Sequence, residues 1–413
     1  MGYELQPVTD AGKRFVELAE QHAESFRQNA TDNDLNARCP VEHFDELRRS
    51  GFAAAFVPKE LGGLGLESVH DWVAGINRLG RGDASIAIGI TMHLGSSRGM
   101  TQAWQQAIKD GDTVVADAIE PGLKAIQAGE RLIYAGFTEP GTDFLHPLTE
   151  ATRTEDGGWS VNGLKIFATM SPAADFLAMN VRMRDEDGDK FGMIQIPANL
   201  PGILPQDDWD SLGMRASGSQ SVVFKDCRLP FEAVRAIGEW GEWNLQILIG
   251  RTVTNLVLLG AFLGIAEEAR AVCMDKLNSQ KKASNTAPHR ELPNVQHALG
   301  ELEIELTAAQ TALTQAAQRL DASLAEYAPD FTPWDVAHQN MKDFQCVKWI
   351  VNQNAIRIVN QAMDLAGGGG YMNGGPLARL YRDVRAGPFM QPYPPTEARQ
   401  YIGKVALGFL PKS

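Results

Sequence analysis

The chain of 413 residues is long enough for about two or three domains, each with a substantial hydrophobic core. Apolar residues make up 44% of the chain and charged residues 22%, as is usual for globular proteins. The 51 acidic and 38 basic residues give a formal net charge of −13. This acidic balance argues against nucleic acid or an anionic membrane as a partner.

The sequence contains no evident targeting segment and few cysteines. The N-terminus lacks a basic segment followed by an apolar stretch, so no signal peptide is expected. The apolar run at residues 256–265 is shorter than the roughly 20 residues that cross a bilayer, so membrane insertion is not expected. The four cysteines, Cys39, Cys227, Cys273 and Cys346, form no Cys-x-x-Cys motif and no pairing with histidine. They are therefore predicted to be reduced thiols that bind no metal, in a cytoplasmic protein.

Residues 1–132 show helical periodicity and are predicted to form an N-terminal α-helical domain. Helices are expected near residues 15–26, 41–47, 71–79 and 84–107, the second starting after Pro40 and stopping at Gly51. Residues 56–65 between them are rich in glycine. Because no Lys-Ser/Thr pair follows, this segment is interpreted as a structural loop rather than a phosphate-binding loop.

Residues 133–237 change to a period of two and are predicted to form a middle domain, a small antiparallel β-barrel or sandwich. Within it, Asn162-Gly163 separates two strand-like segments and predicts a hairpin turn. Upstream, Thr138-Glu139-Pro140-Gly141 predicts a rigid turn, because proline fixes φ and glycine tolerates positive φ. That turn would expose backbone N–H groups and a hydroxyl to whatever lies against the sheet.

Residues 238–413 return to helical spacing. Long helices are expected at residues 244–277, 292–327 and 334–366, and together with a short C-terminal segment they predict a four-helix bundle. A run of four glycines at 367–370 follows the third helix. Consecutive glycines let several backbone N–H groups approach a diphosphate, because no Cβ intervenes.

The turn that begins at Thr138, followed by Asn162, Gly163, Lys165, Phe167 and Thr169, resembles the acyl-CoA dehydrogenase superfamily of FAD enzymes. Flavin-dependent two-component monooxygenases share that fold. The resemblance implies a multidomain α+β fold, with the α-helical domain, the middle β-barrel or sandwich and the four-helix bundle in this order. It also implies FAD as the cofactor, shared between the subunits of a homodimer or homotetramer.

The resemblance assigns site residues position by position. Thr138 is expected to contact the pyrimidine edge of the flavin, Phe167 to cover one flavin face, and Thr169 to hydrogen-bond N5. The implied cofactor contacts are Phe137, Thr138, Thr142, Phe167, Thr169, Gln296, Gly367, Gly368 and Thr396. The implied substrate contacts are Thr142, Arg215 and Asn255.

The chain departs from the family pattern in three places. The loop after the Thr-Glu-Pro turn is shorter, and Thr142 stands where the family has a serine. The family's Arg-x-x-Phe-Gly motif is absent, which leaves Lys281, Lys282 or Arg290 as substitutes. Asp364 replaces a glutamine before the glycines, and an acid near a diphosphate is unfavourable unless a cation pairs with it.

The catalytic base expected from the resemblance is a further departure. The family's reaction removes a proton next to a thioester carbonyl and passes a hydride to the flavin, and a glutamate serves as base. Its two usual positions correspond to Gln391 and Thr254, the latter followed by Asn255 where an arginine is common. Neither residue is a base, and Glu397 is the nearby carboxylate. The candidate catalytic residues are therefore Gln391, Glu397 and Thr254.

Three functions remain open from the sequence. The first is an acyl-CoA or acyl-carrier thioester dehydrogenase with a displaced base, which would pass electrons to an electron-transfer flavoprotein. The second is a monooxygenase that uses O2, a flavin reductase and a C4a-hydroperoxyflavin, and that needs no carboxylate. The third is a non-catalytic FAD-binding subunit. The first two act on a small molecule, and none involves nucleic acid.

Overall fold

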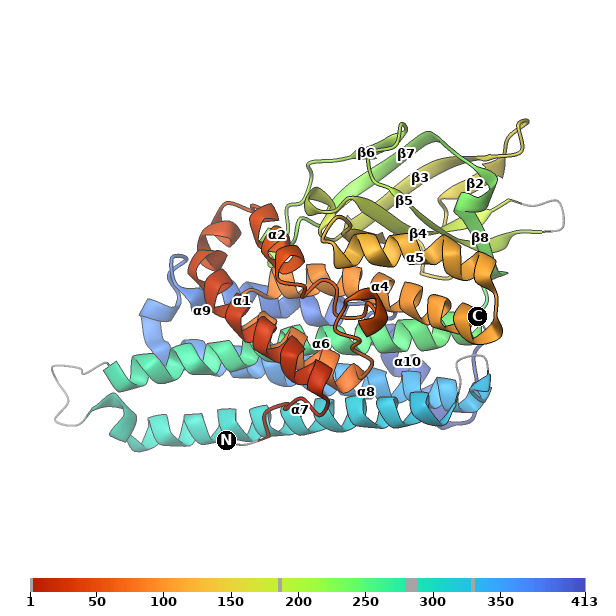
Figure 1. Cartoon of the computed structure of the whole chain (residues 1–413). Coiled ribbons are helices and arrows are strands. Elements are labelled where there is room, and N and C mark those ends of the chain that lie inside the picture. The colour runs from red at the N-terminus through yellow and green to blue at the C-terminus, as the bar shows by residue number, and fades with distance from the viewer. Residues whose placement is uncertain (1–2, 185–187, 280–287, 328–330, 413) are drawn as a thin grey trace.

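The computed structural model describes residues 3–184, 188–279, 288–327 and 331–412. Figure 1 shows a group of N-terminal helices, a twisted sheet lying above them, and long C-terminal helices that run beneath both. The predicted α+β fold class is confirmed. The division of the chain at residues 132 and 237 stays a prediction.

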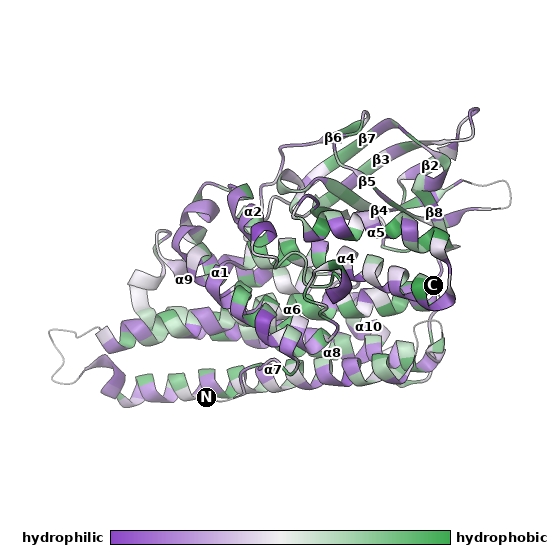
Figure 2. Ribbon diagram, viewed as in Figure 1, coloured by the Kyte–Doolittle hydropathy of each residue, from purple (hydrophilic) through white to green (hydrophobic). Residues whose placement is uncertain are grey.

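The N-terminal helices are α1 (Asp10–Leu35), α2 (Val41–Arg49), α3 (Val69–Gly82), α4 (Ala84–Asp110) and α5 (Thr113–Gln127). Side-chain caps explain where several begin: Thr9 accepts from the N–H of Gly12, and Asp83 from that of Ser85. Helix α5, which begins at its cap Asp112 and contains Pro121, was not expected from the sequence. In Figure 2 polar and apolar residues alternate along α1, as in an amphipathic helix.

The sheet has eight strands, in the order β6-β7-β3-β2-β4-β5-β8, with β1 paired to β4. The strands are β1 (Ile133–Gly136), β2 (Glu150–Arg153), β3 (Trp159–Ala168), β4 (Phe176–Met183), β5 (Lys190–Pro197), β6 (Ile203–Pro205), β7 (Gln220–Leu229) and β8 (Val234–Glu239). Both β1 and β2 run parallel to β4. The sheet is therefore mixed rather than wholly antiparallel as predicted.

The predicted hairpin at Asn162-Gly163 is wrong, because both residues lie inside the continuous strand β3. The register against β7 shifts between Val161 and Gly163, which marks a β-bulge. A Cβ on Gly163 would come within 2.4 Å of the Thr149 hydroxyl, so glycine is needed for close approach rather than for a turn. The Asn162 side chain accepts a hydrogen bond from the Asp226 N–H across the bulge.

The C-terminal region contains α6 (Leu245–Ser279), α7 (Pro293–Glu326), α8 (Trp334–Ala366), α9 (Pro376–Asp383) and α10 (Pro395–Ala406). Helix α6 packs against both α3 and α8 and forms the centre of the core. Its glycines allow this contact, since a Cβ on Gly264 would lie 2.5 Å from the Asn77 carbonyl oxygen. Helix α6 is long and apolar enough to cross a membrane, contrary to the expectation from its apolar run, yet 78% of its most apolar window is buried.

Helix α9 joins all three regions. The Asp383 carboxylate accepts the Met214 N–H at 2.6 Å, and Arg382 pairs with Asp34 of α1 at 2.9 and 2.5 Å. Arg215 donates to the Asp34 carbonyl oxygen at 3.0 Å, and its expected contact with substrate stays a prediction. These bonds fix the turn at residues 213–219, which lies beside the site described below.

Asp383 is 1% exposed, and desolvation raises its pKa from 3.8 to about 6. Its contribution to stability is therefore largest below pH 4 and is lost as the pH rises through about 6. We expect the free energy of unfolding of the wild type, minus that of Asp383→Asn, to fall across this window. Urea unfolding of both proteins between pH 4 and 7 measures the difference, and a difference independent of pH would contradict this assignment.

Candidate active site

A buried ion pair joins the two motifs that carry the family resemblance. Lys165 on β3 is fully buried, and its ammonium donates to Glu139 and to Asn180, the latter at 2.9 Å. Glu139 also accepts the Thr149 N–H at 3.1 Å. Burial lowers the pKa of Lys165 to about 8, and the Glu139 charge opposes that shift. These two residues hold the turn after β1 against β3.

That pairing gathers three of the predicted flavin contacts at one end of the sheet. Isolated bridges join Thr138 to Ile166 and Ala135 to Thr169, so Thr138 lies next to the segment that holds Phe167 and Thr169. Phe167 is 53% exposed, has a φ of +54°, and meets Trp209 edge to face. Positive φ in an aromatic residue is uncommon, and here it presents an apolar ring at the surface.

Hydroxyl groups continue inward from this ring. The Thr169 hydroxyl lies 2.9 Å from that of Ser219, which lies 2.7 Å from the hydroxyl of the buried Ser217. Because Ser217 and Ser219 belong to the turn fixed by Asp383, helix α9 indirectly orients the Thr169 side chain.

A hydrogen-bond chain reaches Thr138 from the bundle. Arg251 on α6 donates to the side-chain oxygen of Gln391, and the amide nitrogen of Gln391 donates to the Thr138 hydroxyl. Gln391 occupies one of the two positions at which the family carries its glutamate. In this chain that position therefore holds a neutral amide, fixed at both ends.

The Arg251 guanidinium lies 4.2 Å from the ring centre of Phe144 and 5.5 Å from that of Phe137. Its Nε is buried without a hydrogen-bond partner, and no ion pair joins it to a carboxylate among the described residues. Burial lowers its pKa to about 10, so it stays charged at neutral pH. Arg251 was not among the residues predicted from the sequence, although it is the one charged residue between positions 245 and 266.

The second family position is Thr254, one turn beyond Arg251 on α6. A Cβ on Gly95 would lie 3.0 Å from the Thr254 methyl group, so α4 packs closely there. Asn255 is buried and donates to the Arg251 carbonyl oxygen at 2.7 Å, within its own helix. Glu397 is exposed in the first turn of α10 and lines a cavity of about 190 Å³ together with Pro392.

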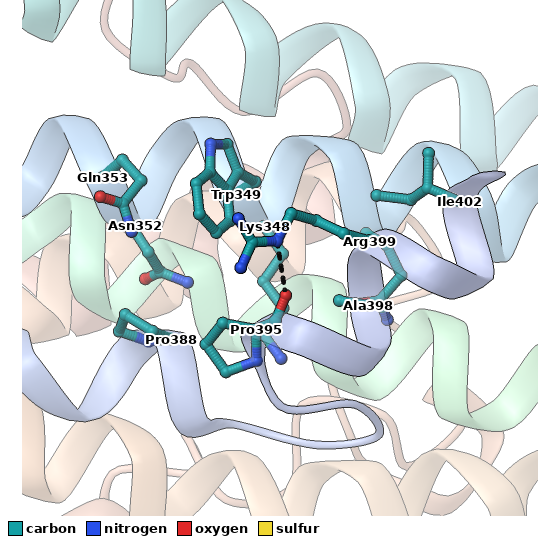
Figure 3. Close-up of a pocket in the computed structure, with 10 residues that line it drawn as sticks. Lys348, Trp349, Asn352, Gln353, Pro388, Pro395, Ala398, Arg399 and Ile402 are labelled. Carbon is teal, nitrogen blue, oxygen red and sulfur yellow. Dashed lines mark hydrogen bonds between the residues drawn. The ribbon is translucent and has the colours of Figure 1, made fainter.

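Lys348 fixes the loop that carries Gln391. It is 4% exposed and donates to the carbonyl oxygens of Met390 and Tyr393, the latter at 2.8 Å. Figure 3 shows Lys348 on α8 facing the segment around Pro395. The hollow there measures about 20 Å³, room for about one water molecule, so it is not a substrate pocket. Burial lowers the pKa of Lys348 to about 7.

The other predicted contacts make local interactions, and their roles stay predictions. The Thr142 hydroxyl donates to the His146 carbonyl oxygen at 2.6 Å and closes its own loop. Gln296 is exposed and donates to the Arg290 carbonyl oxygen at 3.3 Å. Thr396 is exposed beside Glu397. Lys281 and Lys282 lie outside the described residues.

Gly367 and Gly368 are exposed in a short turn after α8. The neighbouring Gly369 faces Lys276, since a Cβ there would lie 3.9 Å from the ammonium. The stretch of α6 from Arg251 to Lys276 spans about 37 Å at the helical rise per residue. A single chain therefore does not bring the glycines and Gln391 to one site.

Three family patterns match this chain. The Acyl-CoA dehydrogenase N-terminal domain matches residues 9–106, the middle domain residues 135–227, and the C-terminal domain residues 256–389. The chain belongs to the acyl-CoA dehydrogenase family.

Its relatives include proteins with other activities. The chain is 33% identical over 404 residues to the amino sugar nitrososynthase DnmZ of Streptomyces peucetius, covering 98% of this chain and 95% of that protein. It is also 33% identical over 404 residues to the L-evernosamine nitrososynthase of a Micromonospora species, covering 97% and 92%.

Solved structures show the same fold. KijD3 in complex with FMN and dTDP-3-amino-2,3,6-trideoxy-4-keto-3-methyl-D-glucose superimposes with a TM-score of 0.90, at 30% identity, covering 100% of this chain and 97% of that one. Butyryl-CoA dehydrogenase from Megasphaera elsdenii has a TM-score of 0.81 at 23% identity, covering 97% and 99%, and supports the fold alone.

The protein is therefore a flavin-dependent oxidoreductase of this fold, and its cofactor is a flavin. The site described above fits such a group. The exposed ring of Phe167 offers a face for a flat heterocycle, and the Thr138 and Thr169 hydroxyls border it. Arg251, whose Nε has no partner, is linked to Thr138 through Gln391. The family predicted from the sequence is confirmed, whereas acyl-CoA dehydrogenation itself is not shown.

Proposed function

We propose that this protein is a flavin-dependent monooxygenase that oxidises the amino group of a nucleotide-linked amino sugar. One observation carries the proposal: neither position of the family's base holds a carboxylate. Gln391 is an amide held between Arg251 and Thr138, and Thr254 is a hydroxyl packed against α4. The relatives named nitrososynthases and the amino-sugar nucleotide bound by KijD3 support the same choice of substrate.

In this proposal Phe167 would cover one face of the flavin, Thr169 would hydrogen-bond N5 and Thr138 would contact the pyrimidine edge. A reduced flavin supplies the two electrons that allow O2 to place one oxygen atom on nitrogen and release the other as water. The protein's part is to orient the amine and exclude water from the apolar ring face.

The charge of Arg251 also suits an amine substrate. A cation nearby disfavours the ammonium form of the substrate and keeps its nitrogen lone pair available. The same charge would hold a carboxylate in its ionised, weakly basic state. The site is therefore better adapted to amine oxidation than to abstraction of a proton from carbon.

We propose a separate flavin reductase as the electron donor and O2 as the oxidant. The FMN bound by KijD3 makes FMN an alternative to FAD in this chain. We also propose a homodimer or homotetramer, in which the exposed glycines Gly367, Gly368 and Gly369 face a neighbouring subunit. The cytoplasmic location stays an expectation.

Product analysis tests the proposed function. The protein is supplied with FMN, NADH, a flavin reductase, air and a dTDP-linked 3-amino sugar, and the sugar is then analysed by mass spectrometry. We expect oxygen to be added to the amino sugar, and no product from the matching sugar with a hydroxyl in place of the amine. Recovery of the amine unchanged, with flavin bound, would overturn the proposal.

Acyl-thioester dehydrogenation remains the second candidate. Glu397 lines a cavity beside Pro392, next to Gln391, and could act as a displaced base. A relative named putative acyl-CoA dehydrogenase YdbM from Bacillus subtilis is 30% identical over 386 residues. Anaerobic bleaching of the bound flavin by butyryl-CoA, abolished in Glu397→Gln, would establish this activity. If the protein formed no oxidised sugar and butyryl-CoA did not bleach its flavin, the third candidate, a non-catalytic flavin-binding subunit, would be supported.

We expect Gln391→Glu not to create a dehydrogenase. The new carboxylate would meet the Arg251 guanidinium, which lowers its pKa and weakens it as a base. Butyryl-CoA should therefore bleach the flavin of this variant no faster than that of the wild type. Rapid bleaching in Gln391→Glu would show that only the missing carboxylate prevents dehydrogenation.

A further inference from the structure

We infer that Arg251, Gln391 and Thr138 form a polarised hydrogen-bond chain that makes the site bind reduced, anionic flavin more tightly than oxidised flavin. The inference rests on the proposed function for the place of the flavin beside Thr138. The three residues of this hydrogen-bond chain would produce the preference together, and none of them would produce it alone.

The direction of the chain follows from its first member. An arginine side chain can only donate hydrogen bonds, so the group of Gln391 that faces it must be the amide oxygen. The amide nitrogen is then left for Thr138 and donates to its hydroxyl oxygen. Because that oxygen already accepts, the hydroxyl proton of Thr138 is free to be donated to a ligand. The site therefore presents a donor backed by a positive charge.

No carboxylate among the described residues pairs with the positive charge of Arg251. Arg251 lies against the rings of Phe137 and Phe144, and its buried Nε has no hydrogen-bond partner. Removing a cation from water without an anion to pair with it is unfavourable. An anion bound nearby would offset that cost, whereas a neutral ligand would not.

The two redox states of a flavin differ in this respect. Oxidised flavin is neutral, while reduced flavin loses a proton from N1 near neutral pH and carries its negative charge on the pyrimidine edge. A group stabilises one state over another only by the difference in its interaction with the two. The donor at Thr138 and the charge at Arg251 interact more strongly with the anion. An oxygenase fed by a separate reductase needs this preference, because it must capture the reduced flavin and release the oxidised one.

The experiment compares dissociation constants of reduced FMN, measured anaerobically, and of oxidised FMN. The proteins are the wild type, Arg251→Met, Gln391→Met and Arg49→Met, the last removing an exposed arginine on α2. We expect the wild type to prefer reduced FMN and both site variants to lose about 10- to 100-fold of that preference, the value of a hydrogen bond to a charged group. Arg49→Met should keep it. Arg251→Lys should restore part of it, because the charge remains.

Two further measurements distinguish an effect of this hydrogen-bond chain on flavin from a purely structural role of its residues. The midpoint potential of bound FMN should fall in the site variants, and the wild-type preference should decline when the pH is low enough to protonate the reduced flavin. An unchanged ratio of the two dissociation constants in folded Gln391→Met would overturn the inference, even if Arg251→Met did not fold. If Arg251→Met bound dTDP more weakly but kept the ratio of the two FMN dissociation constants, Arg251 would instead bind the diphosphate of the substrate. Amine oxidation measured in parallel keeps the proposed function separate, since product can form without the preference.

Discussion

Replacing Thr169 by valine should lower the rate of amine oxidation about 100-fold, the usual effect of removing one oriented donor from a catalytic site. The Thr169 hydroxyl borders the ring of Phe167 and is held at 2.9 Å from that of Ser219. Valine keeps the shape of threonine and removes only the hydrogen bond. Product formation in single turnovers with reduced FMN, substrate and air measures the rate.

Thr169→Ser is the matched control, because it retains the hydroxyl and loses only a methyl group. We expect it to stay within a few-fold of the wild type. Equal rates for Thr169→Val and the wild type would exclude this hydroxyl from the reaction. A loss of flavin binding without a change in rate at saturation would limit its role to holding the cofactor.

Lys165→Met should destabilise the protein by about 3–5 kcal/mol, because it leaves the Glu139 carboxylate buried without its cation. The turn that carries Thr138 depends on this pair, so flavin binding should weaken as well. Urea unfolding measures the first effect, and titration with FMN measures the second.

Lys225→Met is the control for that substitution, since Lys225 is exposed on the neighbouring strand β7. Its stability should lie within about 0.5 kcal/mol of the wild type, as for most surface substitutions. If Lys165→Met were equally stable, the ion pair would not be what joins the two motifs.

Local sequence patterns predicted much of the fold. The long helices α7 and α8 follow from apolar spacing, because each buries one face, and α6 follows from its long apolar run, which is buried on all sides from Asn255 to Ala269. Local patterns failed where tertiary contacts decide the outcome. Asn162-Gly163 has the chemistry of a hairpin turn, yet close packing against Thr149 and pairing with β7 place it in a bulge. Helix α5, which contains Pro121, was not predicted from the sequence.

The site could be predicted only in part. The resemblance predicted Thr138, Phe167 and Thr169 as flavin contacts, and the structure brings these residues together at one end of the sheet. The contact between Thr138 and Gln391 joins residues more than 250 positions apart, and no local pattern reports such a contact. Arg251 did leave a signal, because a lone charge in an apolar helix requires a partner or a function.

Labelling with isotopically heavy oxygen gas tests the central claim most directly. The protein, reduced FMN and the dTDP-linked amino sugar are mixed under heavy O2 in ordinary water, and the sugar product is analysed by mass spectrometry. The account predicts that the oxygen atom on nitrogen is heavy. A product whose oxygen comes from water, or no product alongside anaerobic bleaching of the flavin by an acyl-CoA, would contradict it.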